Sequence, residues 1–171
     1  LGDVYKSQGV KQDGELIHQI ENPSEQVQLA AVKQSSQAFM YIKNPSEEMQ
    51  WAAVKQSPYL IRNIKNPSKE MQLFVVKKDP DLLHVIENPA EEVQIAAVKS
   101  DGRSIRFIRN ASEKVKLMAV ENTPAALPFI SNPTDQMKLT AVNKNGSSIA
   151  HIHDPSEELQ MIAVKQNGLI I

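Results

Sequence analysis

The residues closest to a metal-binding arrangement are His151, His153 and Asp154, which fall within one short stretch of the chain. Imidazole nitrogens and carboxylate oxygens are ligands that zinc accepts. The spacing is loose, and His151 occupies a repeat position that holds packing residues elsewhere, namely Tyr41, Val85 and Phe107. His153 follows a predicted core isoleucine and precedes a predicted helix cap. We therefore predict that these three residues do not form a metal site.

Other chemistry lacks the residues that it requires. The chain contains no cysteine, which excludes disulfides, thiolate zinc sites and thiol nucleophiles. Its Asn-Gly and Asp-Gly pairs are explained by turns and do not indicate a phosphate-binding loop. The glutamates recur where they would lie in the first turn of a helix, so they do not indicate an acid–base pair. The sequence predicts a non-enzymatic protein without a metal or cofactor.

A set of variable charged and aromatic residues is the best candidate for contact with a partner. These residues occupy the sixteenth, nineteenth and twenty-second positions of three successive repeats: Tyr59, Arg62, Lys65, Asp81, His84, Glu87, Arg103, Arg106 and Arg109. One interpretation is a charged face that receives an acidic partner or a phosphate backbone. The other is a ladder in which Lys65, Glu87 and Arg109 pair across neighbouring repeats and add little stability. The two interpretations are compatible.

These residues must be positioned by a 22-residue repeat, which runs without insertion or deletion from Asn22. Each repeat approximates N-P-S-E-E-V-Q-L-A-A-V-K-Q-N-G-x-A-I-x-x-I-K. A fixed period of this size predicts a solenoid in which each repeat contacts its neighbours. We predict one repeat domain, 1–171, with a degenerate half-repeat at 1–21 and repeats at 22–43, 44–65, 66–87, 88–109, 110–131, 132–153 and, in part, 154–171.

Each repeat opens with the signature of a helix start. Asn or Asp stands first, and proline follows everywhere except at Ala111. An Asn N-cap, a proline at the first helical position and a Glu at the third would form a reciprocal capping box. In the first full repeat we therefore predict a helix from Pro23 to about Gln34.

A second helix start is predicted at the fourteenth position. All residues there are N-cap types: Ser35, Ser57, Asp79, Asp101, Thr123, Asn145 and Asn167. Because little chain remains before the next repeat, we expect a short α-helix or a 3₁₀ segment. Isoleucines at the twenty-first position should anchor it in the core: Ile42, Ile64, Ile86, Ile108, Ile130 and Ile152. In the N-terminal half-repeat, Val10, Ile17 and Ile20 fall on core positions.

The first helix of each repeat carries an apolar arc wider than half its circumference, which predicts neighbours on both sides. Within this arc the seventh position is glutamine in five repeats and lysine in two: Gln28, Gln50, Gln72, Gln94 and Gln160, with Lys116 and Lys138. Each amide either bonds the backbone of the adjacent repeat or packs its stem along the core with its tip in water. The lysines favour the second interpretation.

The composition agrees with a helical scaffold. Hydrophobic residues make up 41% of the chain and aromatic residues 5%, which suits thin layers of Ala, Val, Ile and Leu. The net charge of −1 argues against a protein that grips a polyanion along its whole length. No apolar run approaches the roughly 20 residues that cross a bilayer, and no signal-peptide pattern is seen. We expect a cytoplasmic protein.

The run N-P-S-E-E-x-Q-x-x-A-V-K-Q, most complete at 44–56 and 154–168, carries a family resemblance. It resembles short α-helical repeats rich in A-V-K-Q-N-G from uncharacterised bacterial, phage and protist proteins, over essentially the whole chain. The repeat is also similar to the leucine-rich variant repeat, although it is two residues shorter and has a fixed Asn-Pro-Ser. These resemblances imply an all-α solenoid, a right-handed superhelix of α-helix and short helix or 3₁₀ units. They imply no activity, and without cysteine no iron–sulfur cluster.

We expect a non-enzymatic scaffold whose elongated helical-repeat surface binds another protein. One alternative is a nucleic-acid-binding repeat protein that uses a basic face made of Lys43, Arg62, Lys65, Arg103, Arg106 and Arg109. Ala125, Pro128 and Ser131 interrupt the regular polar face that this alternative needs. A further alternative, suggested by the resemblance alone, is a phage-type sequestering or inhibitory protein.

The apolar end of the chain suggests a further contact. Leu169, Ile170 and Ile171 fill core positions of a repeat that no later repeat covers. An open stacking surface favours pairing with another copy. We therefore expect either end-to-end self-association through the C-terminal repeat or a longer repeat array.

Overall fold

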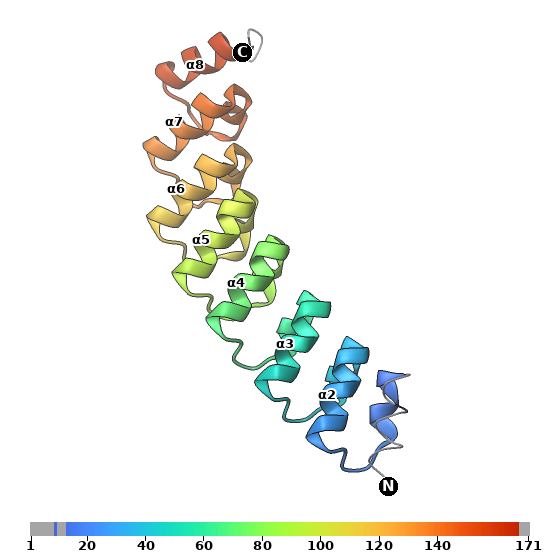
Figure 1. Cartoon of the computed structure of the whole chain (residues 1–171). Helices are drawn as coiled ribbons and strands as arrows, with labels where there is room; N and C mark the ends of the chain where they lie inside the picture. Colours follow the sequence, from blue (N-terminus) through green and yellow to red (C-terminus); the bar gives the residue numbers. More distant parts are fainter. Residues whose placement is uncertain (1–8, 10–12, 168–171) are drawn as a thin grey trace. The chain divides into compact units, whose positions relative to one another are not determined.

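The computed structural model describes residue 9 and residues 13–167 (Figure 1). Every regular element that these residues form is a helix, with ten- or eleven-residue α-helices alternating with six-residue 3₁₀ helices, so the predicted all-α repeat fold is confirmed. The chain divides into two compact units, Leu1–Val75 and Val76–Ile171, each described by itself. The assignment of one repeat domain stays a prediction.

The described part of the first unit contains η1 (Gly14–Gln19), α2 (Glu25–Gln34), η2 (Ser36–Tyr41), α3 (Glu47–Gln56) and η3 (Pro58–Asn63). Helix α2 packs against α3, and η1 packs against η2. Ile17 of η1 is buried, as the N-terminal half-repeat predicts, whereas Val10 lies outside the described residues. Helix α4 (Lys69–Lys78) spans the border between the units.

The second unit contains η4 (Pro80–Val85), α5 (Glu91–Ser100), η5 (Gly102–Phe107), α6 (Glu113–Asn122), η6 (Pro124–Phe129), α7 (Asp135–Lys144), η7 (Gly146–His151) and α8 (Glu157–Asn167). Successive α-helices pack side by side, and successive 3₁₀ helices form a second row (Figure 1). The core lies between the two rows, where Val98, Ile105, Val120, Leu127 and Val142 are buried. In this unit, α-helices therefore stack on α-helices, and 3₁₀ helices stack on 3₁₀ helices.

The predicted start of the short helix is confirmed, and the helix is of the 3₁₀ type. The fourteenth position is the N-cap of each of the following 3₁₀ helices, at Ser35, Ser57, Asp79, Asp101, Thr123 and Asn145. Asp79, Asp101 and Asn145 accept a hydrogen bond from the backbone N–H two residues further on. Asn167 instead ends α8. The isoleucines of the twenty-first position are buried or half-buried, as predicted.

The predicted start of the first helix is wrong by two residues. Helix α2 begins at Glu25, and its N-cap is Ser24, whose carbonyl accepts the first helical hydrogen bond from Gln28 at 2.9 Å. Asn22 has a left-handed backbone with φ of 49°, so it ends the preceding turn and cannot form the predicted capping box. Asn tolerates this conformation better than other residues with side chains. The same displacement recurs in the other repeats whose caps are described.

Both interpretations of the seventh-position glutamines are wrong in part. Each amide donates to a backbone carbonyl, but within its own repeat: Gln28 to Pro23, Gln50 to Pro45, Gln72 to Pro67, Gln94 to Pro89 and Gln160 to Pro155, over 2.8–3.1 Å. The amide therefore satisfies the carbonyl that the Asn-Pro turn leaves without a helical partner. The lysines instead pair with a first-turn carboxylate, Lys116 with Glu113 at 2.7 Å and Lys138 with Asp135 at 3.1 Å.

The amides that join neighbouring repeats stand at the thirteenth position, where the sequence analysis did not look for them. Gln56 donates to the carbonyl of Val32 at 2.7 Å, and Asn122 donates to Val98 at 3.1 Å. Gln166 donates to Val142 and also accepts from the N–H of Gly146 at 2.8 Å. One side chain thus binds the last turn of the preceding α-helix and the start of the preceding 3₁₀ helix.

The close contact between neighbouring repeats also explains the glycine at the fifteenth position, two residues after the position of the bridging amides. A Cβ atom on Gly102 would overlap the carbonyl oxygen of Ala119, so only glycine fits without a shift of the backbone. The N–H of Gly102 donates to the hydroxyl of Thr123 in the next repeat at 3.0 Å. The Leu169, Ile170 and Ile171 segment lies outside the described residues, so end-to-end self-association stays a prediction.

Candidate partner-binding face

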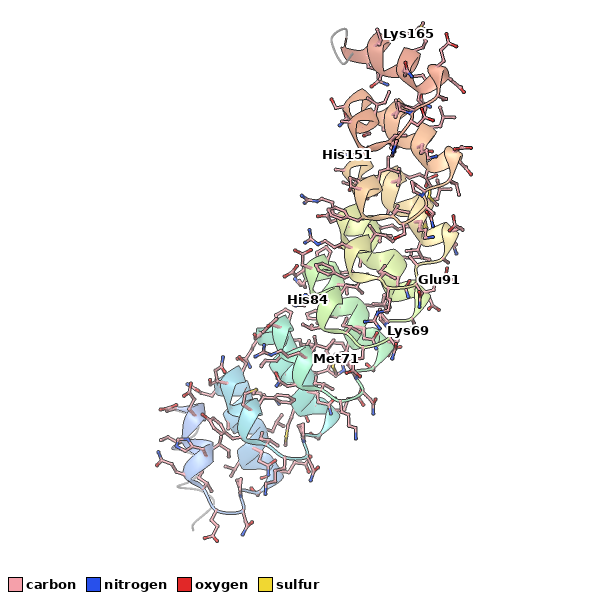
Figure 2. The ribbon with its side chains drawn as sticks, turned by 180° about the vertical axis from the view of Figure 1, so that it is seen from behind. Lys69, Met71, His84, Glu91, His151 and Lys165 are labelled. Atoms are coloured by element: carbon pink, nitrogen blue, oxygen red, sulfur yellow. The ribbon has the colours of Figure 1, made fainter. Side chains whose placement is uncertain are left out.

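The predicted partner-binding residues all lie exposed on 3₁₀ helices or in the loops that follow them. Those of the first unit are Tyr59, Arg62 and Lys65, at and after η3. Those of the second unit are Asp81, His84, Glu87, Arg103, Arg106 and Arg109, at and after η4 and η5. We call the exposed surface of the 3₁₀ helices of each unit its 3₁₀ face. In the second unit, His84 and His151 lie on the side of the 3₁₀ face, and Glu91 lies on the opposite side (Figure 2).

An arginine of the second unit is held across two repeats. Arg106 Nη2 lies 3.1 Å from both carboxylate oxygens of Asp81, which belongs to the preceding 3₁₀ helix. Its guanidinium also lies 4.6 Å from the ring centroid of Phe107. The Phe107 ring in turn lies 5.4 Å from the ring of His84. Because these contacts restrain one another's side chains, Asp81, Arg106, Phe107 and His84 have a defined arrangement.

The imidazole of His84 is oriented by its own helix. Its Nδ1 lies 2.5 Å from the carbonyl oxygen of Asp81. A carbonyl oxygen only accepts, so Nδ1 carries the proton and Nε2 of the neutral ring is an acceptor. The same arrangement is found in the first unit, where His18 Nδ1 contacts the carbonyl of Glu15 at 2.5 Å and the His18 ring lies 5.3 Å from that of Tyr41.

A second arginine of the second unit is bound to the cap of its own helix. Arg103 donates to both carboxylate oxygens of Asp101, with the shortest contact at 2.7 Å. The hydrogen bonds from the Arg103 side chain are the largest influence that holds the pKa of Asp101 below its ordinary value, although desolvation opposes them. The same pair raises the pKa of Arg103. Arg103 and Arg106 are therefore both partly neutralised.

The predicted charge ladder is not the pairing that the second unit uses. Among its described residues, no ion pair involves Glu87 or Arg109, whereas one pair across repeats joins Asp81 to Arg106. Lys65 belongs to the other unit. Arg109 is thus the exposed arginine of this group whose charge no carboxylate of the described chain neutralises.

In the first unit, the 3₁₀ face carries an aromatic and cationic group. Arg62 donates to the hydroxyl of Tyr59 at 2.7 Å, and its guanidinium lies 4.2 Å from the Tyr59 ring centroid. Such a cation–π contact holds both side chains in one orientation. The predicted Tyr59 and Arg62 are therefore brought together, one turn apart on η3.

Large apolar side chains also stand exposed on the 3₁₀ faces, and of these the sequence predicts only Tyr59 as a partner-binding residue. Met40, Tyr41 and Tyr59 of the first unit are 49%, 52% and 43% exposed, and Phe129 of the second unit is 45% exposed. We interpreted the twentieth position as a packing position, yet Tyr41, Phe129 and His151 are exposed there. The prediction that His151 is a packing residue is wrong, because its side chain is exposed, whereas Val85 and Phe107 at the same position are half-buried. The recurrence of aromatic residues at that position was the available signal.

The described residues contain no group of three His, Cys, Asp or Glu side chains that could hold a metal ion. No helix in the described part of the chain combines the length and the apolarity that a bilayer crossing needs. Comparisons of the sequence with models of protein families and with curated proteins, and of the fold with solved structures, give no match.

Proposed function

We propose that this chain is a non-enzymatic protein-binding module that contacts its partner through the 3₁₀ faces. The observation that supports the proposal is the composition of these surfaces, on which large apolar side chains stand exposed among arginines. Tyrosine and arginine are over-represented among the residues that dominate binding energy, and methionine is enriched at interfaces. A solvent-exposed aromatic group that its own fold does not bury is suited to burial against another protein.

The pairing of the arginines favours a protein over a nucleic acid. Arg103 and Arg106 are each bound to a carboxylate of the chain, Asp101 and Asp81 respectively. A phosphate backbone would have to compete with both carboxylates and would meet their negative charge. A protein partner can use the same groups as preformed hydrogen-bonding pairs and bury the aromatic rings beside them. The cytoplasmic location and the repeat family remain predictions from the sequence.

The test is affinity capture from the native host with three forms of the chain: wild type, the double variant Arg103→Glu and Arg106→Glu, and a control. The control is Lys99→Glu and Lys165→Glu, which reverses the same amount of charge on exposed positions of the α-helices. We expect a partner that wild type and control retain and the 3₁₀-face variant loses. With the purified partner, the loss should be at least about tenfold in Kd.

Two results would contradict this proposal. One is a partner retained equally by all three forms, which would place the binding surface elsewhere. The other is submicromolar binding of a mixed oligonucleotide at physiological salt, weakened steeply by added salt and abolished in the Arg103→Glu and Arg106→Glu variant. That second result would support the nucleic-acid alternative.

A further inference from the structure

Two adjoining grooves follow the loops between 3₁₀ helices and α-helices in the second unit. One has a volume of about 530 Å³ beside Asn88, and the other has about 380 Å³ beside Asn132. Both are lined by Ile108, Arg109 and Asn110, so they meet at the loop between η5 and α6. We call the pair the loop groove.

The lining of the loop groove repeats with the chain. One isoleucine from each of three repeats reaches the lining; Ile108 is half-buried, whereas Ile86 and Ile130 are buried in the core. One asparagine from each contributes an amide: Asn88, Asn110 and Asn132. Phe107 lines the first groove and Phe129 the second. The groove therefore offers an exposed amide once per repeat, with accessible apolar surface from Phe107, Ile108 and Phe129.

The three asparagine amides have unused hydrogen-bonding capacity. Their side chains are exposed, and within the described chain none of them takes part in a hydrogen bond. A primary amide offers both donors and acceptors, which matches the N–H and C=O groups of a peptide backbone. Stacked helices lie about 10 Å apart, and an extended peptide advances about 3.3 Å per residue. One amide would thus serve every third residue of an extended peptide.

The charge of the loop groove selects among such peptides. Its described lining contains Arg109 and Lys116 and no Asp or Glu. Lys116 pairs with Glu113 at 2.7 Å, which leaves Arg109 as the cation available to a ligand. The next groove of the same unit, of about 350 Å³, is lined by Asp135, Asp154 and Glu158 with one lysine, Lys138. An acidic ligand is therefore attracted at Arg109 and repelled one loop further on.

We propose that the loop groove binds an extended peptide segment of a partner protein, with an acidic side chain at Arg109 and apolar side chains against Ile108 and Phe129. This inference rests on the proposed function and adds the binding segment and its chemistry. A polyanion fits less well, because Glu91 and Glu113, the first residues of α5 and α6, stand three residues after Asn88 and Asn110. A peptide with a single carboxylate at Arg109 brings no further negative charge close to Glu91 and Glu113, so it avoids their repulsion.

The experiment selects binders from a random peptide library displayed on phage, with the whole chain as bait. We expect selected peptides to share an acidic residue that has apolar residues two or three positions away. A fluorescein-labelled selected peptide then reports affinity by fluorescence anisotropy. Arg109→Ala and Asn110→Ala should each weaken binding, the first at least about tenfold. The control Lys99→Ala, an exposed cation of α5 outside the groove, should leave it unchanged.

A double-mutant cycle makes the assignment specific. Replacement of the acidic peptide residue by its amide should weaken binding to wild type, but not further in Arg109→Ala, because the same contact is already lost. Circular dichroism of each variant confirms that the helices remain. Additive losses of binding free energy in the cycle would overturn the proposal, and so would selected peptides without an acidic residue. Arg109-dependent binding of a fluorescein-labelled oligonucleotide that displaces the peptide would also overturn it.

The two proposals fail separately. If no peptide is selected while partner capture still depends on Arg103 and Arg106, the loop groove proposal is wrong and the protein-binding function stands. If peptides bind as expected while capture does not depend on those arginines, the groove proposal stands and the 3₁₀ face is not the contact surface.

Discussion

Ser104 is the residue at which packing and polarity conflict most directly. Its side chain is fully buried, and its hydroxyl has no hydrogen-bond partner in the described chain. The same position holds Ala38 and Ala126 in other repeats, both fully buried. A buried hydroxyl without a partner keeps the cost of its lost hydration. The fold accepts alanine at this position at least as well as serine.

We predict that Ser104→Ala raises the free energy of unfolding by about 1 kcal/mol, because it removes the unsatisfied hydroxyl without opening a large cavity. Urea unfolding followed by circular dichroism measures the change. The reverse substitution in the next repeat, Ala126→Ser, is the control and should lower stability. A loss of stability in Ser104→Ala would mean that the hydroxyl has a partner.

Individual residues also show what could be predicted about the candidate site. The exposure of Arg103 and Arg106 follows from their places between the buried positions of a short helix, and the sequence contains that information. The pairing of Arg106 with Asp81 does not follow in the same way, because the two residues are 25 positions apart and meet only through the offset between stacked repeats. The ladder through Glu87 and Arg109 assumed no offset.

At the scale of helices, the cap shows how two sequence rules compete. Asn and Ser are both favoured N-cap residues, and in each Asn-Pro-Ser they flank the proline. The proline rule selects Asn, because proline is favoured at the first helical position. The backbone selects Ser: in Asn44-Pro45-Ser46, Ser46 is extended and its carbonyl accepts the first helical hydrogen bond from the N–H of Gln50 at 3.0 Å. Ser112, which follows Ala111, is also extended and accepts a bond from the N–H of Val115 at 3.3 Å. Residue type alone cannot decide between two N-cap residues that stand two positions apart and satisfy the same rule.

A pair of variants in one repeat tests this cap. Ser112→Ala should lower the free energy of unfolding by about 1 kcal/mol, and it also removes the bond from the Ser112 hydroxyl to Glu91 at 2.6 Å. Asn110→Ala should change stability little, since Asn110 caps no described helix and its backbone is outside the left-handed region. Urea unfolding compares the two. A larger loss of stability in Asn110→Ala than in Ser112→Ala would show that Asn110 is the N-cap.

At the scale of the molecule, stability should be distributed along the chain. Each repeat of a stacked array contacts only its neighbours, so a local defect has a limited range. The sequence repeat was sufficient to predict this arrangement and the alternation of helices. It did not reveal the division at Val75 and Val76, because the buried Val75 and Val76 follow the same repeat pattern as their equivalents.

Leu127→Ala provides the test. Leu127 is a fully buried core residue of η6, and such a truncation costs about 2–5 kcal/mol. Hydrogen exchange measured by mass spectrometry should become faster in α6, η6 and α7, and stay unchanged in α2 and α3 of the first unit. Faster exchange throughout the chain would show that the two units unfold together, contrary to this prediction.

The bridging amides at Gln56, Asn122 and Gln166 bind carbonyl oxygens of the preceding repeat. Every amino acid carries such a carbonyl, so a substitution on the exposed surface of one repeat leaves the junction to the next intact. Mutations at exposed positions that make no pair across repeats, unlike Arg106 with Asp81, therefore need no compensating change in the neighbour. A lineage of such proteins is free to diversify its binding surface one repeat at a time.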